Sequence, residues 1–248
     1  KKYGRDEVET RGLKVTTTLN WDLELRAEEI IKEMAPDLEK NFSAGNVGMV
    51  GLDPKTGQIL VMIGSRDYFE EVGYSKFNVT LAHRQPGSSF KPIVYAAAFA
   101  KGYTPETTLF DLPTQFSASC NTLGKPLIPG GDPESCYMPV NYDERFRGPI
   151  SIREALAQSI NIPGVKTLYL VGLPDAIATA RSLGISSLRD PSRYGLTLVL
   201  GGGEVSPLEL TGAYGVFAND GVRNAPVGIL KVEDAGGNVL EEFVPSPE

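Results

Sequence analysis

The pattern of apolar and polar positions predicts short strands near both ends of the chain and helices in its middle. A β-rich stretch at 13–19 precedes Asn20, which is suited to cap a helix from Trp21 to about Met34. Because proline lacks the N–H that a helix interior uses, Pro36 is expected to end this helix. Apolar residues recur in it at the spacing of one helix face, at Leu23, Ala27, Ile30, Ile31 and Met34.

Two pairs of apolar runs predict β-hairpins. Within residues 46–65, two such runs flank Asp53-Pro54-Lys55-Thr56-Gly57, which has the composition of a turn. Near the other end, runs at 229–233 and 239–243 flank Gly236-Gly237. Both hairpins are expected to supply antiparallel strands.

A central helix is predicted to begin near Ser88, to run through Phe99 and to stop at Gly102. It is apolar nearly all round, so we expect it to lie buried in the core. Two Ser-x-x-Glu capping boxes predict later helices. The helix that begins at Ser151-Ile152-Arg153-Glu154 should carry Ser159 and be interrupted by Pro163, and the one that begins at Ser206-Pro207-Leu208-Glu209 should reach Asn219.

Residues 103–148 are rich in Pro, Gly and Asn and are expected to be irregular. A long irregular segment in a compact domain is often functional. This segment contains both cysteines of the chain, Cys120 and Cys136, which either form a disulfide, as in an oxidising compartment, or remain two free thiols. Neither has a second cysteine or a histidine at metal-ligand spacing, so no metal site is expected.

Strands early, helices in the middle and strands late favour an α+β fold. A content of 41% hydrophobic and 22% charged residues is typical of a folded soluble protein.

The net charge of −7 provides no basic face for a nucleic-acid partner. No apolar run is long enough to span a membrane, and the first residues do not resemble a signal peptide. Gly201-Gly202-Gly203 lacks the Gly-Lys-Ser/Thr of a phosphate loop, and no cofactor is expected.

The strongest chemical signal is Ser88-Ser89-Phe90-Lys91, in a chain whose single histidine is His83. A serine nucleophile needs a base, and a lysine that its surroundings keep neutral can replace the usual imidazole. On a helix, the spacing from Ser88 to Lys91 places both side chains on one face. At the start of a helix, unpaired backbone N–H groups would also face the site and could bind an oxyanion.

A second polar pair, Ser159 and Asn161, is expected at a helix end, where Ser159 could relay protons and Asn161 could hold a substrate amide or the lysine. Ser119-Cys120-Asn121 has the same spacing, but it lies in the irregular segment, where rigid placement is harder.

The segment Arg84-Gln85-Pro86-Gly87-Ser88-Ser89-Phe90-Lys91-Pro92 resembles the active-serine segment of the class A, bifunctional penicillin-binding proteins. These are peptidoglycan transpeptidases, and the resemblance covers most of the chain. It implies the penicillin-binding protein and serine β-lactamase-like fold, an antiparallel sheet flanked by helices. Four further segments carry it: Gly12 to Leu19, Asp53 to Gly57, Phe146 to Pro163, and Leu200 to Gly221.

The resemblance implies a role for four residues. Ser88 would attack the penultimate D-alanine of a stem peptide, and Lys91 would accept its proton. Ser159 would pass a proton to the leaving amine, and Asn161 would orient the substrate amide. An amine of a second stem peptide would complete the crosslink, and β-lactam antibiotics would acylate Ser88 as covalent inhibitors.

The family's third motif, Lys-Thr-Gly on a late strand, is expected beyond Glu248, since Lys55-Thr56-Gly57 lies in a turn before the serine. The chain is thus expected to hold a linker region at 1–45 and the first part of a transpeptidase domain at 46–248, incomplete at its C-terminus and inactive alone. The final strands would come from a second chain, or the sheet would keep an unpaired edge. The family's upstream glycosyltransferase domain and membrane anchor would place the protein on the extracytoplasmic face of a bacterial membrane.

Two other functions fit the same residues. In one, water takes the place of the acceptor amine, which gives a DD-carboxypeptidase or a β-lactamase. In the other, the chain is a non-catalytic module that binds peptidoglycan or senses β-lactams.

Overall fold

The computed structural model describes residues 3–70 and 75–247, which divide into two compact units. One unit comprises Lys1–Arg84, Leu183–Ser187 and Val205–Glu248. The other comprises Gln85–Ser182 and Leu188–Glu204 and contains all four predicted site residues. We refer to them as the first and the second unit.

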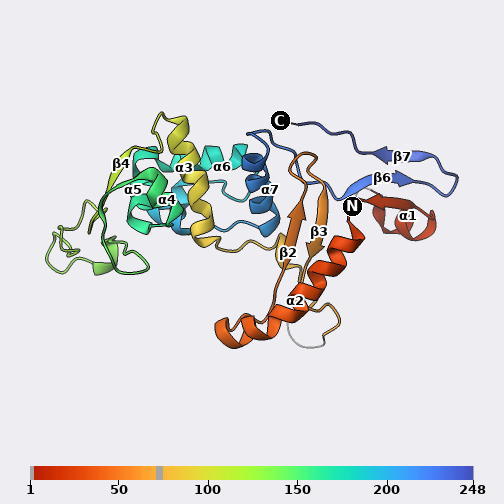
Figure 1. The fold of residues 1–248 in the computed structure, drawn as a ribbon, viewed down its shortest axis with the longest axis horizontal. Coiled ribbons are helices and arrows are strands. Elements are labelled where there is room, and N and C mark those ends of the chain that lie inside the picture. Colours follow the sequence, from red (N-terminus) through yellow and green to blue (C-terminus); the bar gives the residue numbers. More distant parts are fainter. Residues whose placement is uncertain (1–2, 71–74, 248) are drawn as a thin grey trace. The chain divides into compact units, whose positions relative to one another are not determined.

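In the first unit, helix α2 (Trp21–Phe42) packs along a hairpin of strands β2 (Met49–Leu52) and β3 (Ile59–Ile63) (Figure 1). The strands pair antiparallel, and the carboxylate of Asp53 closes the turn by accepting hydrogen bonds from the Lys55 N–H and the Thr56 hydroxyl. This confirms the predicted hairpin. Its core consists of buried Ala27, Ile31, Val61 and Ile63.

Helix α2 is longer than predicted, because it continues through Pro36 to Phe42. Asn20 caps its start as expected, with its side chain accepting from the Leu23 N–H at 3.1 Å. Pro36 is exposed, so water can reach the backbone carbonyl that the missing N–H leaves unpaired. Buried Ile31 and Ala35 hold the turns around it. Of the predicted apolar face, Leu23 and Met34 are exposed.

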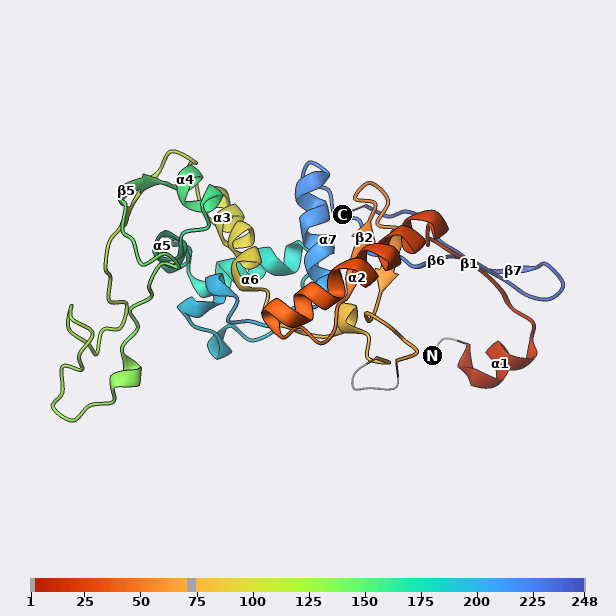
Figure 2. The ribbon, with the colours of Figure 1, turned by 60° about the horizontal axis from the view of Figure 1, so that its bottom comes forward.

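A second sheet of the first unit has the order β1-β6-β7. All three strands are labelled in Figure 2. Strand β1 (Lys14–Thr17) pairs antiparallel with β6 (Ile229–Glu233), and β6 pairs antiparallel with β7 (Val239–Glu242). The predicted late hairpin is therefore confirmed, with Gly237 at a φ of 83° in its turn. The same unit contains α1 (Gly4–Thr10), the 3-10 helix η1 (Val79–Leu81) and α7 (Pro207–Ala218), which starts with the predicted capping box.

The second unit is built around α3 (Lys91–Ala100), which α4 (Ile152–Ala157), α5 (Asn161–Val171) and α6 (Leu173–Ser182) contact (Figure 1). The buried side chains of α3 confirm the predicted central helix. Strands β4 (Thr108–Asp111) and β5 (Gly148–Ser151) form a short antiparallel pair beside it. All pairings between the strands of the described residues are antiparallel, which fits the expected α+β class.

The helix predicted from Ser151 to Ser159 is shorter than expected. Its capping box is present, but α4 ends at Ala157, and Ser159 lies in a link with a φ of 54°. Pro163 does not interrupt a helix, because it lies in the first turn of α5, where a missing N–H costs little. Strand β4 and helix α6 are elements that the sequence pattern did not predict.

Most of the residues between β4 and β5 are irregular, as expected, apart from the 3-10 helix η3 (Pro133–Ser135). Cys120 and Cys136 form a disulfide within this segment, with 5.6 Å between their Cα atoms. The structure therefore decides between the two alternatives in favour of the disulfide. Two more 3-10 helices, η4 (Pro191–Arg193) and η5 (Leu196–Leu200), complete the second unit.

Candidate active site

Ser88 and Lys91 lie on one turn of the 3-10 helix η2 (Gly87–Phe90), which leads directly into α3. The Lys91 N–H donates to the Ser88 carbonyl, and side chains three residues apart eclipse each other on such a turn. The Ser88 side chain is exposed, whereas Lys91 is only 1% exposed. Among the described residues, none accepts or donates a hydrogen bond with the Ser88 hydroxyl. This arrangement leaves the hydroxyl open to an incoming substrate.

The Lys91 amine contacts both other predicted site residues. Its Nζ lies 2.5 Å from the Ser159 carbonyl oxygen, 3.1 Å from Ser159 Oγ and 2.8 Å from Asn161 Oδ1. Burial disfavours the charged form and lowers the pKa of Lys91 to about 8. About a tenth of this lysine is therefore neutral at pH 7, far more than for an ordinary lysine, and a general base needs this neutral form.

The Lys91 amine is the donor in all three contacts. The Ser159 carbonyl and Asn161 Oδ1 can only accept, so they take two of its N–H groups. The third N–H of the protonated amine donates to the Ser159 hydroxyl at 3.1 Å. When Lys91 is neutral, a lone pair replaces one N–H and can take a proton from a hydroxyl. Ser159 is thus in place to exchange a proton with Lys91.

The backbone of Ser159 has a conformation that residues other than glycine seldom adopt. Its φ of 54° lies in the left-handed region, which costs energy for a residue with a Cβ. This turn between α4 and α5 allows both the carbonyl and the hydroxyl of Ser159 to reach the Lys91 amine. A strained residue at such a point is characteristic of functional sites.

The side chain of Asn161 is fixed at both ends. Its Nδ2 donates to the Val140 carbonyl at 3.0 Å, which directs Oδ1 to Lys91. Asn161 is also the first residue of α5, so its backbone has the position of a helix start. The structure therefore brings Lys91, Ser159 and Asn161 into direct contact and places Ser88 one turn before the lysine.

Glycine 201 is a site-supporting residue that the sequence reasoning missed. It ends η5 at a φ of 90°, and a Cβ on it would overlap the backbone N of Gly87 and lie 2.5 Å from the Gly87 Cα. Only glycine therefore allows η5 to pack against the turn that carries Ser88. The signal was present as Gly201-Gly202-Gly203, which was excluded as a phosphate loop and otherwise entered only as part of the segment Leu200 to Gly221 that carries the resemblance.

The competing Ser-x-Asn match has a local role in its own loop. Asn121 Oδ1 accepts from the backbone N–H groups of Leu123 and Lys125, and the Ser119 hydroxyl contacts that of Ser117. Lys55-Thr56-Gly57 lies in the β2–β3 turn, as expected.

In the described residues no group of His, Cys, Asp and Glu is arranged to hold a metal ion. None of the helices described is long and apolar enough to cross a membrane.

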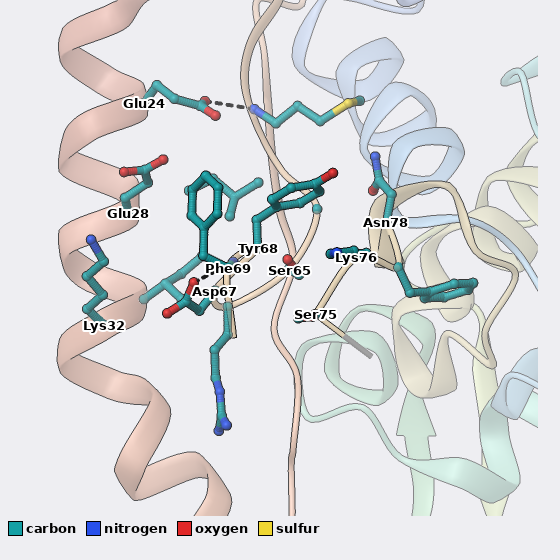
Figure 3. A pocket seen from close by; sticks show the side chains of 16 residues that line it. Glu24, Glu28, Lys32, Ser65, Asp67, Tyr68, Phe69, Ser75, Lys76 and Asn78 are labelled. Carbon is teal, nitrogen blue, oxygen red and sulfur yellow. Dashed lines mark hydrogen bonds between the residues drawn. The ribbon is translucent and has the colours of Figure 1, made fainter. Parts of the chain in front are cut away.

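A cavity of about 560 Å³ lies in the first unit, between α2 and the segment after β3. Figure 3 shows Glu24, Glu28 and Lys32 along α2 on one side, Lys76 and Asn78 on the other, and the rings of Tyr68 and Phe69 between them. The Glu24 carboxylate accepts from the Met62 N–H at 3.0 Å, so it ties the helix to β3. The lining includes none of the predicted site residues.

Comparison with known proteins shows the family to which the chain belongs. The family model of the penicillin binding protein transpeptidase domain matches residues 47–245. Penicillin-binding protein 1A of Aquifex aeolicus (strain VF5) is 38% identical over 217 residues, which are 87% of this chain and 26% of that protein. The crystal structure of penicillin-binding protein 1A from Haemophilus influenzae superposes with a TM-score of 0.67 and 30% identity, covering 82% of this chain and 28% of that one.

The penicillin G acyl-enzyme complex of penicillin-binding protein A from M. tuberculosis has the same fold. It superposes with a TM-score of 0.69 at 20% identity, over 96% of this chain and 59% of that one. The chain spans about a quarter to a third of the length of the first curated relatives that it matches.

Proposed function

Because this chain belongs to the transpeptidase domain family of the penicillin-binding proteins, we propose that it crosslinks peptidoglycan stem peptides through an acyl-enzyme on Ser88. The observation that carries the proposal is the buried Lys91 amine, which lies one turn after an exposed serine and within reach of Ser159 and Asn161. A buried lysine with a lowered pKa is suited to act as a base for a serine.

In the acylation step, Ser88 Oγ bonds to the carbonyl carbon of the penultimate D-alanine while its proton moves to Lys91 Nζ. The N–H groups at the start of the helical turn would stabilise the oxyanion. The bond from this carbon to the nitrogen of the terminal D-alanine then breaks. That nitrogen takes the proton from Lys91 by way of the Ser159 hydroxyl, and free D-alanine leaves. Asn161 would hold the substrate amide.

In the second step, an amine of a neighbouring stem peptide bonds to the same carbonyl carbon. The ester bond to Ser88 breaks, and Ser88 Oγ recovers a proton from the attacking amine through Lys91. A β-lactam would be opened by the same first step and would stay on Ser88. The M. tuberculosis protein of the same fold forms such an acyl-enzyme with penicillin G.

The same proposal extends to organisation and location. Residues 1–45 would form a linker region and 46–248 would belong to the transpeptidase domain. The protein would act on the extracytoplasmic face of a bacterial membrane, and the Cys120–Cys136 disulfide supports an oxidising compartment.

The test is the mass of the intact protein, at its natural length, after incubation with benzylpenicillin. We expect one added penicilloyl group in the wild type and none in the Ser88→Ala variant. Ser89→Ala is the matched control, since its hydroxyl bonds the Pro86 carbonyl at 2.5 Å, and it should still gain the adduct. A wild type without adduct, or an adduct that survives Ser88→Ala, would refute the proposal.

A further inference from the structure

We infer that Asn141, held by the buried carboxylate of Asp111, is a positioning residue that sets Asn161 and the Lys91 amine for catalysis. This inference rests on the proposed function of Ser88 and Lys91. Neither Asn141 nor Asp111 is part of the motifs from which the site was predicted. Both belong to the segment between α3 and α4, and both lie in the second unit with the site.

The first observation concerns the start of α5. Its N-cap residue, Ile160, offers no side-chain acceptor for the free N–H groups of the first turn. Asn141, 20 residues before Asn161 in the chain, supplies the missing acceptor. Asn141 Oδ1 accepts from the Asn161 N–H at 3.2 Å and from the Ile162 N–H at 3.1 Å. A helix start that ordinary capping would leave loose is thereby fixed by a remote side chain.

The second observation concerns what holds Asn141. Its side chain is 2% exposed, and its Nδ2 donates to Asp111 Oδ1 at 2.8 Å and to the Arg145 carbonyl at 2.7 Å. Every strong donor and acceptor of the amide is therefore used, so its orientation is determined. Asp111 is fully buried, and it also accepts from the Arg147 N–H at 3.0 Å. The Arg147 guanidinium lies 3.6 Å from the same carboxylate and offsets its charge.

The third observation connects this cluster to the chemistry. The neighbouring Val140 carbonyl accepts from Asn161 Nδ2, so residues 140 and 141 hold both the side chain and the backbone N–H of Asn161. These two hydrogen bonds direct Asn161 Oδ1 to Lys91 Nζ. A continuous series of hydrogen bonds thus runs from Asp111 through Asn141 and Asn161 to the lysine. If it is broken, the first turn of α5 and the amide that contacts Lys91 lose their fixed position.

The experiment measures the rate of acylation by a fluorescent penicillin, using the protein at its natural length. Because a misplacement of about 1 Å can reduce a rate about a hundredfold, we expect Asn141→Ala to acylate about ten to a hundred times more slowly than the wild type. Tyr142→Ala is the matched control, since its side chain is fully exposed, and it should acylate at the wild-type rate. In the double variant Asn141→Asp with Asp111→Asn, residue 141 carries the carboxylate and residue 111 the amide, so the hydrogen bond between them is kept with its direction reversed. This variant should recover part of the acylation rate that Asn141→Ala loses.

A purely structural cap would behave differently, so a second readout is the pKa of Lys91, followed by NMR of ¹³C-labelled lysine. We expect Asn141→Ala to raise this pKa from the wild-type value, because loosening the turn admits water to the amine. If Asn141→Ala does not fold, Asn141→Ser carries the same test, since it keeps a capping hydroxyl and is too short to bond Asp111.

The outcomes separate the two proposals. A wild type that is never acylated overturns the proposed function. A folded Asn141→Ala variant whose acylation rate and Lys91 pKa both match those of an acylated wild type overturns this inference and leaves the proposed function standing.

Discussion

Lys91 is 1% exposed, and the three oxygens within hydrogen-bond distance of its amine belong to Ser159 and Asn161, none of them a carboxylate. Taking a charge out of water without an opposite charge is unfavourable, which is why burial lowers the pKa of this lysine to about 8. In an unfolded chain its pKa would be about 10.4. Holding this lysine in the folded protein therefore costs stability while it is charged, as expected of a residue kept for function.

This cost predicts a pH dependence of stability. Between pH 8 and about 10, the unfolded chain holds a proton on Lys91 that the folded protein has released, so the free energy of unfolding should rise with pH, by up to about 3 kcal/mol in total. Tyr95, whose pKa burial raises to about 12, acts in the opposite direction only above about pH 10. Urea titrations over this range should show the rise.

In Lys91→Met the rise should be absent, whereas Lys101→Met, which alters a partly exposed lysine paired with Asp175, should keep it. An equal slope in wild type and Lys91→Met would show that this lysine is charged in the folded protein.

Gly201 offers a second test at a single position. Gly201→Ala should slow acylation of Ser88 and lower stability by about 1 to 3 kcal/mol, because the new methyl group overlaps Gly87 and the φ of 90° is strained. Gly195→Ala, at the other end of η5, is the control, since nothing lies within 4 Å of its Cβ position. Guanidinium denaturation and penicillin acylation rates measure both effects. Equal behaviour of the two variants would contradict this account of Gly201.

The start of a helix could be predicted from the sequence where its capping partners are neighbours in the chain. Helix ends that depend on contacts with distant residues could not be predicted. The capping boxes at Ser151 and Ser206 and the cap at Asn20 involve partners within three residues, and all three are present. The break between α4 and α5 depends instead on the contact of Ser159 with Lys91, 68 residues away. It also depends on the two backbone N–H groups of α5 that donate to the Asn141 side chain. No spacing pattern along the chain reports such contacts.

In helix α2 a strong local signal led to a wrong prediction. Pro36 predicted the end of the helix, but packing on both sides of the proline keeps the helix intact to Phe42. Because proline costs about 3 kcal/mol relative to alanine inside a helix, Pro36→Ala should raise the free energy of unfolding by about 1 to 3 kcal/mol. The new N–H would donate to the Lys32 carbonyl. Glu33→Ala, at an exposed position of the same helix, should change little. Equilibrium denaturation that shows no gain for Pro36→Ala would mean that the helix is already adapted to the proline.

For the molecule as a whole, the resemblance identified the family from segments spread over most of the chain, and the family model matches residues 47–245. The roles proposed for Ser88, Lys91, Ser159 and Asn161 also came from that resemblance and remain proposals, and the structure adds that Lys91 is in direct contact with Ser159 and Asn161. The disulfide was left open by the sequence, because two cysteines 16 residues apart can be brought together or kept apart by the loop between them.

That disulfide should stabilise the irregular segment of the second unit. A bridge that closes a loop of about 15 residues contributes about 3 kcal/mol in chain-entropy estimates. The double variant Cys120→Ser, Cys136→Ser should therefore unfold at lower guanidinium concentration, by an amount close to that estimate. Thiol titration of the oxidised wild type under denaturing conditions should find no free thiol. Two reactive thiols, or an unchanged midpoint in the double variant, would contradict the bridge.

The decisive measurement is the rate of Ser88 acylation by benzylpenicillin as a function of pH. If neutral Lys91 removes the proton, the rate should rise about tenfold per pH unit below the pKa of about 8 and level off above it. The adduct should map to the peptide that contains Ser88 throughout. A rate that does not change with pH across this range, with the adduct still on Ser88, would show that Lys91 is not the base.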